Sequence, residues 1–222
     1  MDKYHIGTRL AGYPRNYIKD LALFLDEKSG KRFSERIVPH LTFIPPFIID
    51  NEEEVINIFN STLSKFNKDL TTYKINGFGF FTKPEPVFYA NIEKNEKINK
   101  MIKSLENNLE NKITYLSEKI SDIGETNKYL HVTVSKDFNP EEFNNIISSI
   151  DEYTNKYKFR EMEHPLFRIY LLKNKYILRE HSFALEESLY QPKAKRPFIF
   201  EEDKEIFSRK SGLKLSSDGM VN

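Results

Sequence analysis

Two short stretches of the sequence share one pattern, a histidine and a threonine separated by a single apolar residue. The first is PHLTFIPPF at residues 39–47 and the second is LHVTVSKDF at residues 130–138. Both are rich in β-branched and aromatic residues, which favour β-strands. Because side chains two apart in a strand project from the same face, each histidine shares a face with its threonine. The apolar residue between them points to the opposite face, where a core can bury it.

The remainder of the chain alternates between strand and helix patterns. Strand patterns occupy residues 4–12, 36–44, 71–82, 86–94, 128–138, 157–164, 166–174 and 176–185. Helical spacing of apolar residues marks 17–25, 55–66, 98–109 and 139–150. Asp50 and Asn51 are expected to supply one helix N-cap and Asn139 another, and the last two strands are expected to turn near Asn174. Pro45 and Pro46 cannot donate to a central ladder, so they are expected to end the strand of the first motif.

This alternation contains a repeat, since each motif strand is followed by a helix and later by a pair of strands. The repeat predicts two similar lobes of helices and strands, with the halves meeting at about residues 93–111. If an approximate two-fold axis relates the lobes, both histidine–threonine pairs face one groove. The pattern ends near Leu185, so we expect one domain over residues 1–189 and an appendage over 190–222.

Length and composition limit the classes of protein to consider. With 222 residues, 39% of them hydrophobic, the chain can bury a sizeable core. Its net charge of +1 offers no general attraction to long nucleic acids or acidic membranes. The absence of cysteine excludes disulfides and thiolate chemistry. No signal sequence or membrane-spanning stretch is recognisable, so we expect a cytoplasmic monomer with no membrane partner.

Two imidazoles that face one groove suit the chemistry of phosphodiesters. One neutral histidine can take a proton from water or a ribose hydroxyl, and the other, protonated, can give one to the leaving oxygen. Threonine hydroxyls can hydrogen-bond the phosphoryl oxygens as negative charge builds up on them. We therefore predict His40 and His131 as the catalytic pair and Thr42 and Thr133 as phosphate-binding residues. This chemistry requires no metal and no cofactor.

Other polar and aromatic residues have competing explanations. Lys136 follows the second motif and either contacts the phosphate or is an ordinary surface lysine. Phe80, Tyr89 and Tyr170 either belong to the core and the sheet surfaces or stack a nucleobase at the edge of the groove.

The remaining histidines, His5, His164 and His181, show no metal-ligand spacing. A structural or exposed position is the simpler explanation for each, and a zinc site is not expected. A single His-x-Thr in a strand is likewise more often a matter of packing. Its recurrence at equivalent positions of a repeated pattern is what favours catalysis.

The two motifs resemble those of the 2H phosphoesterase superfamily, named for its paired His-x-Thr or His-x-Ser sequences. Within it the chain is similar to the branch of 2′-5′ RNA ligases and RNA 2′,3′-cyclic phosphodiesterases, including the double proline of the first motif. The resemblance covers about residues 4–185 and implies a bilobal, pseudo-two-fold duplicated α+β fold. An antiparallel sheet with flanking helices forms each lobe of such a fold, and the active-site groove lies between the lobes. The acid-base roles fall on His40 and His131, and which of them is the acid is left open.

The resemblance implies metal-independent opening of 2′,3′-cyclic phosphates on RNA ends or nucleotides, which leaves a 2′-phosphate, and also a reversible 2′-5′ RNA ligase activity. The partner would then be an RNA end or a small nucleotide. An alternative within the superfamily is cleavage of 2′-5′ oligoadenylates or cyclic oligonucleotide signals. An alternative of another class is an RNA-end or nucleotide-binding module without turnover, which the two intact histidines disfavour.

Overall fold

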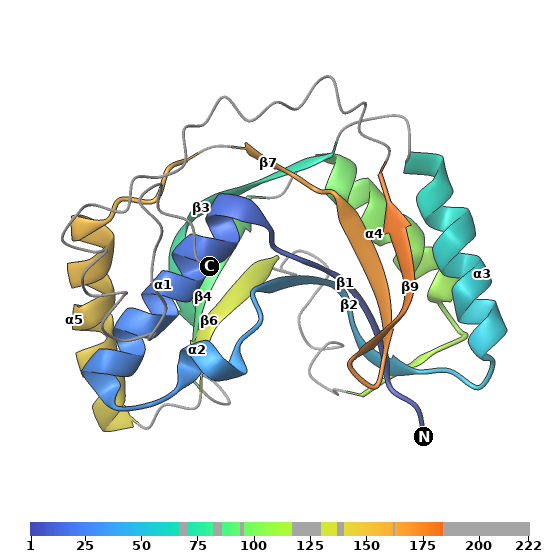
Figure 1. Cartoon of the computed structure of the whole chain (residues 1–222). Coiled ribbons are helices and arrows are strands. Elements are labelled where there is room, and N and C mark those ends of the chain that lie inside the picture. The colour runs from blue at the N-terminus through green and yellow to red at the C-terminus, as the bar shows by residue number, and fades with distance from the viewer. Residues whose placement is uncertain are drawn as a thin grey trace, which may run out of the picture. The chain divides into compact units, whose positions relative to one another are not determined.

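The computed structural model describes residues 1–66, 71–81, 86–93, 96–116, 130–136, 140–161 and 163–183 (Figure 1). Residues up to Leu185 form one compact unit. The expected appendage at 190–222 and the expected helix cap at Asn139 lie outside the described residues, so both stay predictions.

Helices and strands alternate along the chain much as the periodicity predicts. Within the described residues they are β1 (Tyr4–Arg9), α1 (Gly12–Ser29), α2 (Phe33–Arg36), β2 (His40–Ile48), α3 (Glu52–Leu63), the 3₁₀ turn η1 (Ser64–Phe66), β3 (Thr72–Phe81), β4 (Val87–Glu93), α4 (Glu96–Leu109), β5 (Thr114–Tyr115), β6 (His131–Lys136), α5 (Pro140–Lys156), β7 (Glu163–Pro165), β8 (Arg168–Lys173) and β9 (Tyr176–Ser182). None of the helices in this part of the chain is long and apolar enough to cross a membrane.

The strands form two sheets, and every described pair of neighbours is antiparallel. One sheet has the order β5-β2-β1-β8-β9 and the other β6-β4-β3-β7. We call the first sheet with α3 and α4 the first lobe, and the second sheet with α1 and α5 the second lobe. Figure 1 shows α3 and α4 on the side of β2 and β9, and α1 between α5 and the strands β3, β4 and β6. The expected bilobal α+β fold with antiparallel sheets is therefore confirmed.

The lobes are not two consecutive halves of the chain. Strands β1 and β2 are neighbours in the first lobe, yet α1, which connects them, packs on α5 and β6 of the second lobe. Strands β4 and β6 are neighbours in the second lobe, yet α4 between them packs on α3 and β2 of the first. The same exchange occurs in both directions, which agrees with a pseudo-two-fold duplication. The predicted division near residues 93–111 is wrong, because each lobe takes elements from both ends of the chain.

Burial and capping explain the local structure of α3, which follows the first motif. The Asn51 side chain accepts hydrogen bonds from the backbone N–H groups of Glu53 and Glu54 at 3.0 and 3.3 Å, so the expected N-cap is confirmed. Val55, Phe59 and Leu63 recur at helical spacing and are fully buried. The helix therefore packs one apolar face on its lobe.

The second lobe is held by aromatic packing between helix α1 and its neighbours. The ring of Tyr17 stacks on Phe78 of β3 with centroids 6.1 Å apart and meets Tyr153 of α5 edge-on at 5.6 Å. Its hydroxyl donates to the backbone carbonyl of Tyr157 at 2.6 Å. These contacts tie the helix that leaves the first lobe firmly to the second.

The double proline does not end the strand of the first motif. Strand β2 starts at His40 and runs through both prolines to Ile48. Between Ile44 and Phe47 its register against β1 shifts, and this irregularity accommodates residues that cannot donate to the ladder. The Pro46 carbonyl still accepts from the backbone N–H of Leu116, at 3.0 Å. The prolines mark a bulge inside the strand.

Three further boundaries differ from the sequence prediction. Residue 36, where the strand of the first motif was expected to begin, instead ends the short helix α2. The expected strand at 157–164 is reduced to β7, and the two-residue strand β5 had no counterpart in the prediction. The turn between β8 and β9 is where it was expected, with Asn174 and Lys175 in the left-handed region at φ 48° and 75°.

Candidate active site

The first motif lies on β2, and its polar side chains share the face that points away from the core. His40 pairs with Arg9 of β1 and Thr42 pairs with Gly7. Leu41 and Phe43, on the other face, are 0% and 2% exposed. The alternation of a strand therefore places the first histidine and threonine as the sequence pattern predicts.

The imidazole of His40 is exposed and held by its own backbone. Its Nδ1 lies 2.7 Å from the carbonyl oxygen of Val38. Since a carbonyl oxygen only accepts, Nδ1 carries the hydrogen of this bond. In the neutral ring, Nε2 then has a free lone pair, which is the form that a general base needs.

A third histidine lies near His40 that the sequence pattern did not connect with it. His5 precedes Gly7 and Arg9 by two and four residues on β1, so it shares their face. Partial burial lowers the pKa of His5, and the charge of His40 lowers it further. The two imidazoles therefore share one face of the first lobe, and the charge of His40 acts on His5.

The second motif occupies the corresponding face of β6. His131 pairs with Asn91 of β4 and Thr133 pairs with Tyr89. Val132, between them, is fully buried on the other face. Both motif residues are partly exposed.

Two aromatic rings pack against the His131 imidazole. The ring of Phe81 meets it nearly at right angles, with centroids 5.0 Å apart and an interplanar angle of 81°. The ring of Tyr89 is also tilted steeply against it, with centroids 5.5 Å apart and an interplanar angle of 62°. His131 is thus packed by side chains from two other strands, whereas His40 is bound by its own backbone.

The two motif strands contact one another, although they belong to different sheets. Strand β2 of the first lobe approaches β6 of the second, and the short helix α2, just before β2, also contacts β6. The fold therefore brings together two strands that lie about ninety residues apart in the sequence. The expected groove between them stays a prediction.

Lys136 shares a face with Thr133 only because β6 is irregular. Three residues separate the two positions, so a regular strand would place them on opposite faces. The register against β4 shifts between the pairs Tyr89–Thr133 and Phe88–Ser135, and Lys136 then pairs with Val87. Since Val87 and Tyr89 alternate regularly on β4, Lys136 returns to the face of the motif.

The three predicted stacking residues lie in different places. Phe80 packs on Phe88 with centroids 5.0 Å apart and belongs to the core face of the second lobe, in agreement with the first of its two explanations. Its neighbour Phe81 and Tyr89 occupy the face of His131. Tyr170 pairs with Gly7 on β1, which places it two strands away from Thr42 on the same face.

The other two histidines play no part in this arrangement. His164 is 5% exposed among the rings of Tyr13, Tyr73 and Phe159, and its Nε2 has no hydrogen-bond partner. Burial lowers its pKa to about 4. His181 lies on β9 and packs edge-on against Phe183. Within the described ranges, no three His, Asp or Glu side chains gather as a metal ion would require, and the expected independence from metal stays a prediction.

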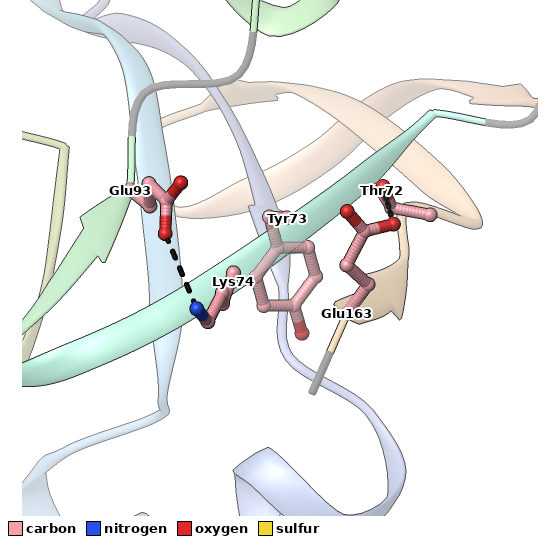
Figure 2. A pocket seen from close by; sticks show the side chains of 5 residues that line it. All are labelled: Thr72, Tyr73, Lys74, Glu93 and Glu163. Carbon is pink, nitrogen blue, oxygen red and sulfur yellow. Dashed lines mark hydrogen bonds and ion pairs between the residues drawn. The ribbon is translucent and has the colours of Figure 1, made fainter. Parts of the chain in front are cut away.

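A small pocket on the second lobe is separate from the motif strands. Its volume is about 60 Å³, and it is lined by Thr72, Tyr73, Lys74, Glu93 and Glu163 (Figure 2). Lys74 forms ion pairs with Glu93 and Glu161 at 3.6 Å, and Thr72 donates to Glu163 at 2.8 Å. Because β7 lies at the edge of the sheet opposite β6, this pocket is not part of the candidate active site. Ligand pockets for nucleotide-sized molecules are several times larger.

Two lobes that each present a His-x-Thr strand define the class of 2H phosphoesterases. The chain belongs to the 2′-5′ RNA ligase superfamily, whose family model matches residues 14–174. No curated protein matches the sequence.

Among solved structures, the fold is similar to that of TT0787 of Thermus thermophilus. The TM-score is 0.53 at 16% sequence identity, over 83% of this chain and all of the other. At this identity the likeness concerns the fold alone.

Proposed function

We propose that this protein is a metal-independent phosphoesterase that opens 2′,3′-cyclic phosphates on RNA ends or nucleotides and leaves a 2′-phosphate. The observation that carries the proposal is the contact between β2 and β6, each with a histidine and a threonine on its non-core face. Membership of the 2′-5′ RNA ligase superfamily supports the class of reaction.

In the proposed reaction His40 is the general base and His131 the general acid. The Nε2 atom of neutral His40 takes a proton from water while the water oxygen forms a bond to phosphorus. The bond between phosphorus and the ribose O3′ breaks, and O3′ takes a proton from protonated His131. The products are a 2′-phosphate and a 3′-hydroxyl, and proton exchange with solvent resets both imidazoles.

The difference between the two imidazoles supports this assignment of roles. His40 is exposed to water, and the Nδ1–H bond to Val38 keeps its Nε2 lone pair available when the ring is neutral. His131 is packed against Phe81 and Tyr89 and is less exposed to water than His40, so the role of base is assigned to His40 and that of acid to His131. The roles of Thr42 and Thr133 are to hydrogen-bond the phosphoryl oxygens, with Lys136 as a further cation on the same face.

Purified protein in EDTA tests the proposal with four substrates: 2′,3′-cyclic nucleotides, RNA with a cyclic phosphate end, 2′-5′ oligoadenylate and cyclic dinucleotides. We expect turnover of the cyclic phosphates with a 2′-phosphate product, identified by chromatography. His40→Gln and His131→Gln should each reduce it by roughly 10² to 10⁴. His181→Gln is the matched control, because this histidine lies on the core face of the first lobe and should retain activity.

Three results would overturn the proposal in different ways. Loss of activity in EDTA that zinc restores would contradict metal independence. Turnover of oligoadenylate or cyclic dinucleotides alone would show that the enzyme acts on these substrates and not on 2′,3′-cyclic phosphates. Nucleotide binding without any turnover would identify a binding module.

A further inference from the structure

Two aromatic side chains form a stacked pair beside the second motif. Phe81 at the end of β3 and Tyr89 of β4 lie with ring centroids 4.2 Å apart and an interplanar angle of 25°. Both side chains are partly exposed. A pair of this size left partly exposed on a sheet surface offers a flat apolar area to a further ring.

The glycine next to Tyr89 explains how this ring is placed. Gly79 pairs with Tyr89 across the ladder, and a Cβ atom at Gly79 would lie 2.7 Å from the tyrosine oxygen and 2.8 Å from the ring. The tyrosine ring therefore lies across the glycine, in space that a side chain on β3 would otherwise fill. Its orientation is set by the sequence of the neighbouring strand.

The stacked pair borders both residues of the second motif. Tyr89 is the ladder partner of Thr133, and both rings meet the His131 imidazole edge-on. A phosphate bound at Thr133 would thus stand next to an aromatic surface. A nucleoside attached to that phosphate extends over several ångströms, which is enough to bring its base against the rings.

The first lobe presents a different surface at the equivalent position. The ladder partner of Thr42 is Gly7, where even a Cβ atom would lie 2.5 Å from the backbone oxygen of Leu41. The ladder partner of His40 is Arg9, a cation. The strand next to the second motif therefore offers an aromatic ring, whereas the strand next to the first offers a glycine and a cation.

We propose that Phe81 and Tyr89 bind the nucleobase of the nucleotide whose cyclic phosphate is opened. This inference rests on the proposed function and adds the orientation of the substrate, with the base on the second lobe. The ligand is an unpaired nucleotide, since both faces of a paired and stacked base are already covered. Because every base has an aromatic face, the site tolerates different bases.

A pair of substrates separates base binding from catalysis. A 2′,3′-cyclic nucleotide carries the base, and ribose 2,3-cyclic phosphate lacks it. We expect Tyr89→Leu and Phe81→Leu to reduce kcat/KM for the nucleotide relative to the abasic substrate by roughly 5-fold to 100-fold, the range measured for base–aromatic stacking. Tyr89→Phe keeps the ring and should keep the wild-type ratio.

Two more variants sharpen the test. Gly79→Ala places a methyl group where the Tyr89 ring lies, so the ring must move and KM for the nucleotide should rise. Tyr176→Leu is the matched control, the same substitution at a tyrosine that is 80% exposed at the start of β9 in the first lobe. For this variant the ratio of kcat/KM between the nucleotide and the abasic substrate should equal that of the wild type. Thermal melting verifies that each variant is folded.

Equal losses on both substrates would overturn the inference, because they would show that the rings only position His131. Calorimetry with 2′-AMP and ribose 2-phosphate distinguishes this failure from a failure of the proposed function. If no cyclic phosphate is turned over, a preference for 2′-AMP that Tyr89→Leu removes still supports the base site. If wild-type protein binds both ligands equally, the base site is refuted whatever the activity.

Discussion

The two His-x-Thr strands carry the same residues on the same face but stand in different surroundings. His40 is exposed, bonded through Nδ1 to Val38 and opposite a cation, Arg9. His131 is partly covered, opposite the amide of Asn91, and packed by aromatic rings. Duplication thus explains the residue types and their spacing. The differences between the two sites come from other strands, β1 in the first lobe and β3 and β4 in the second.

A motif that is repeated symmetrically is therefore compatible with an asymmetric reaction. An in-line displacement needs one proton acceptor and one proton donor, although both are imidazoles here. The motif itself cannot distinguish them. Neighbouring side chains can, because they set solvent exposure, the tautomer and the stability of the charged form.

The largest expected effect is a difference between the two histidines that depends on the leaving group. His40→Ala and His131→Ala should each reduce kcat for a 2′,3′-cyclic nucleotide by roughly 10² to 10⁴. With a nucleotide p-nitrophenyl phosphodiester the leaving group departs as an anion and needs no acid. His131→Ala should then keep a much larger share of wild-type kcat/KM than His40→Ala. The reverse order would exchange the roles, and equal losses on both substrates would remove the distinction.

The threonines should respond alike, because their proposed role does not depend on the surroundings. Thr42→Val and Thr133→Val preserve shape and remove the hydroxyl, and each should lower kcat by about 10²-fold, as expected for loss of one donor to a developing charge. Thr114→Val, on strand β5 at the edge of the first sheet, is the control and should have wild-type kinetics. A loss at only one of the two motif positions would mean that only one threonine holds the phosphate.

Acid should lower the free energy of unfolding through the second lobe, because His164 is buried there. Its folded-state pKa of about 4 lies below the ordinary value of 6.5, so the unfolded chain binds the proton more readily. The stabilisation from a neutral His164 is complete above pH 6.5 and is lost as the pH falls toward 4. At pH 5 the loss is about 2 kcal/mol.

His164→Phe keeps an aromatic ring in this cluster and removes the titration. Urea unfolding of both proteins at pH 7.5 and pH 5.0 measures the difference in the free energy of unfolding. The variant should lose less stability than the wild type over this interval. An identical loss in both proteins would show that His164 titrates normally in the folded state.

The smallest expected effect concerns His5, which couples to the first motif only. Repulsion by His40 contributes to the lowered pKa of His5, after burial. In His40→Gln the pKa of His5 should therefore rise but stay below 6.5, because burial remains. NMR titration of the imidazole resonances measures this change. His131→Gln is the control, and an equal rise there would contradict the influence of His40 on His5.

Much of the fold was predictable because local patterns agree with tertiary packing. Period-two alternation around Leu41 and Val132 identified the faces of both motif strands, and helical spacing with an asparagine cap identified α3. These signals are encoded within a few residues. The exchange of α1 and α4 between lobes is not local, so no pattern in the chain indicated it.

The surroundings of the site were less predictable because bulges change which face a residue occupies. The register shift in β6 returns Lys136 to the motif face, and one in β3, at Gly77 with φ of 126°, precedes Phe80 and Phe81. Counting by two from the motif cannot anticipate either shift. Gly77 was the one available signal, since a glycine inside a strand often marks a bulge.

The exchange of connecting helices has a consequence for how the protein is made. Tyr4 of β1 pairs with Lys173 of β8, and α1, which leaves β1, needs α5 and β6 to pack upon. When the ribosome has synthesised the chain only as far as the first motif, β8 is not yet available to pair with β1, and α5 and β6 are not yet available to pack against α1. We expect the nascent chain to gain little native structure until β8 emerges, after which both histidines reach their places in a single late step.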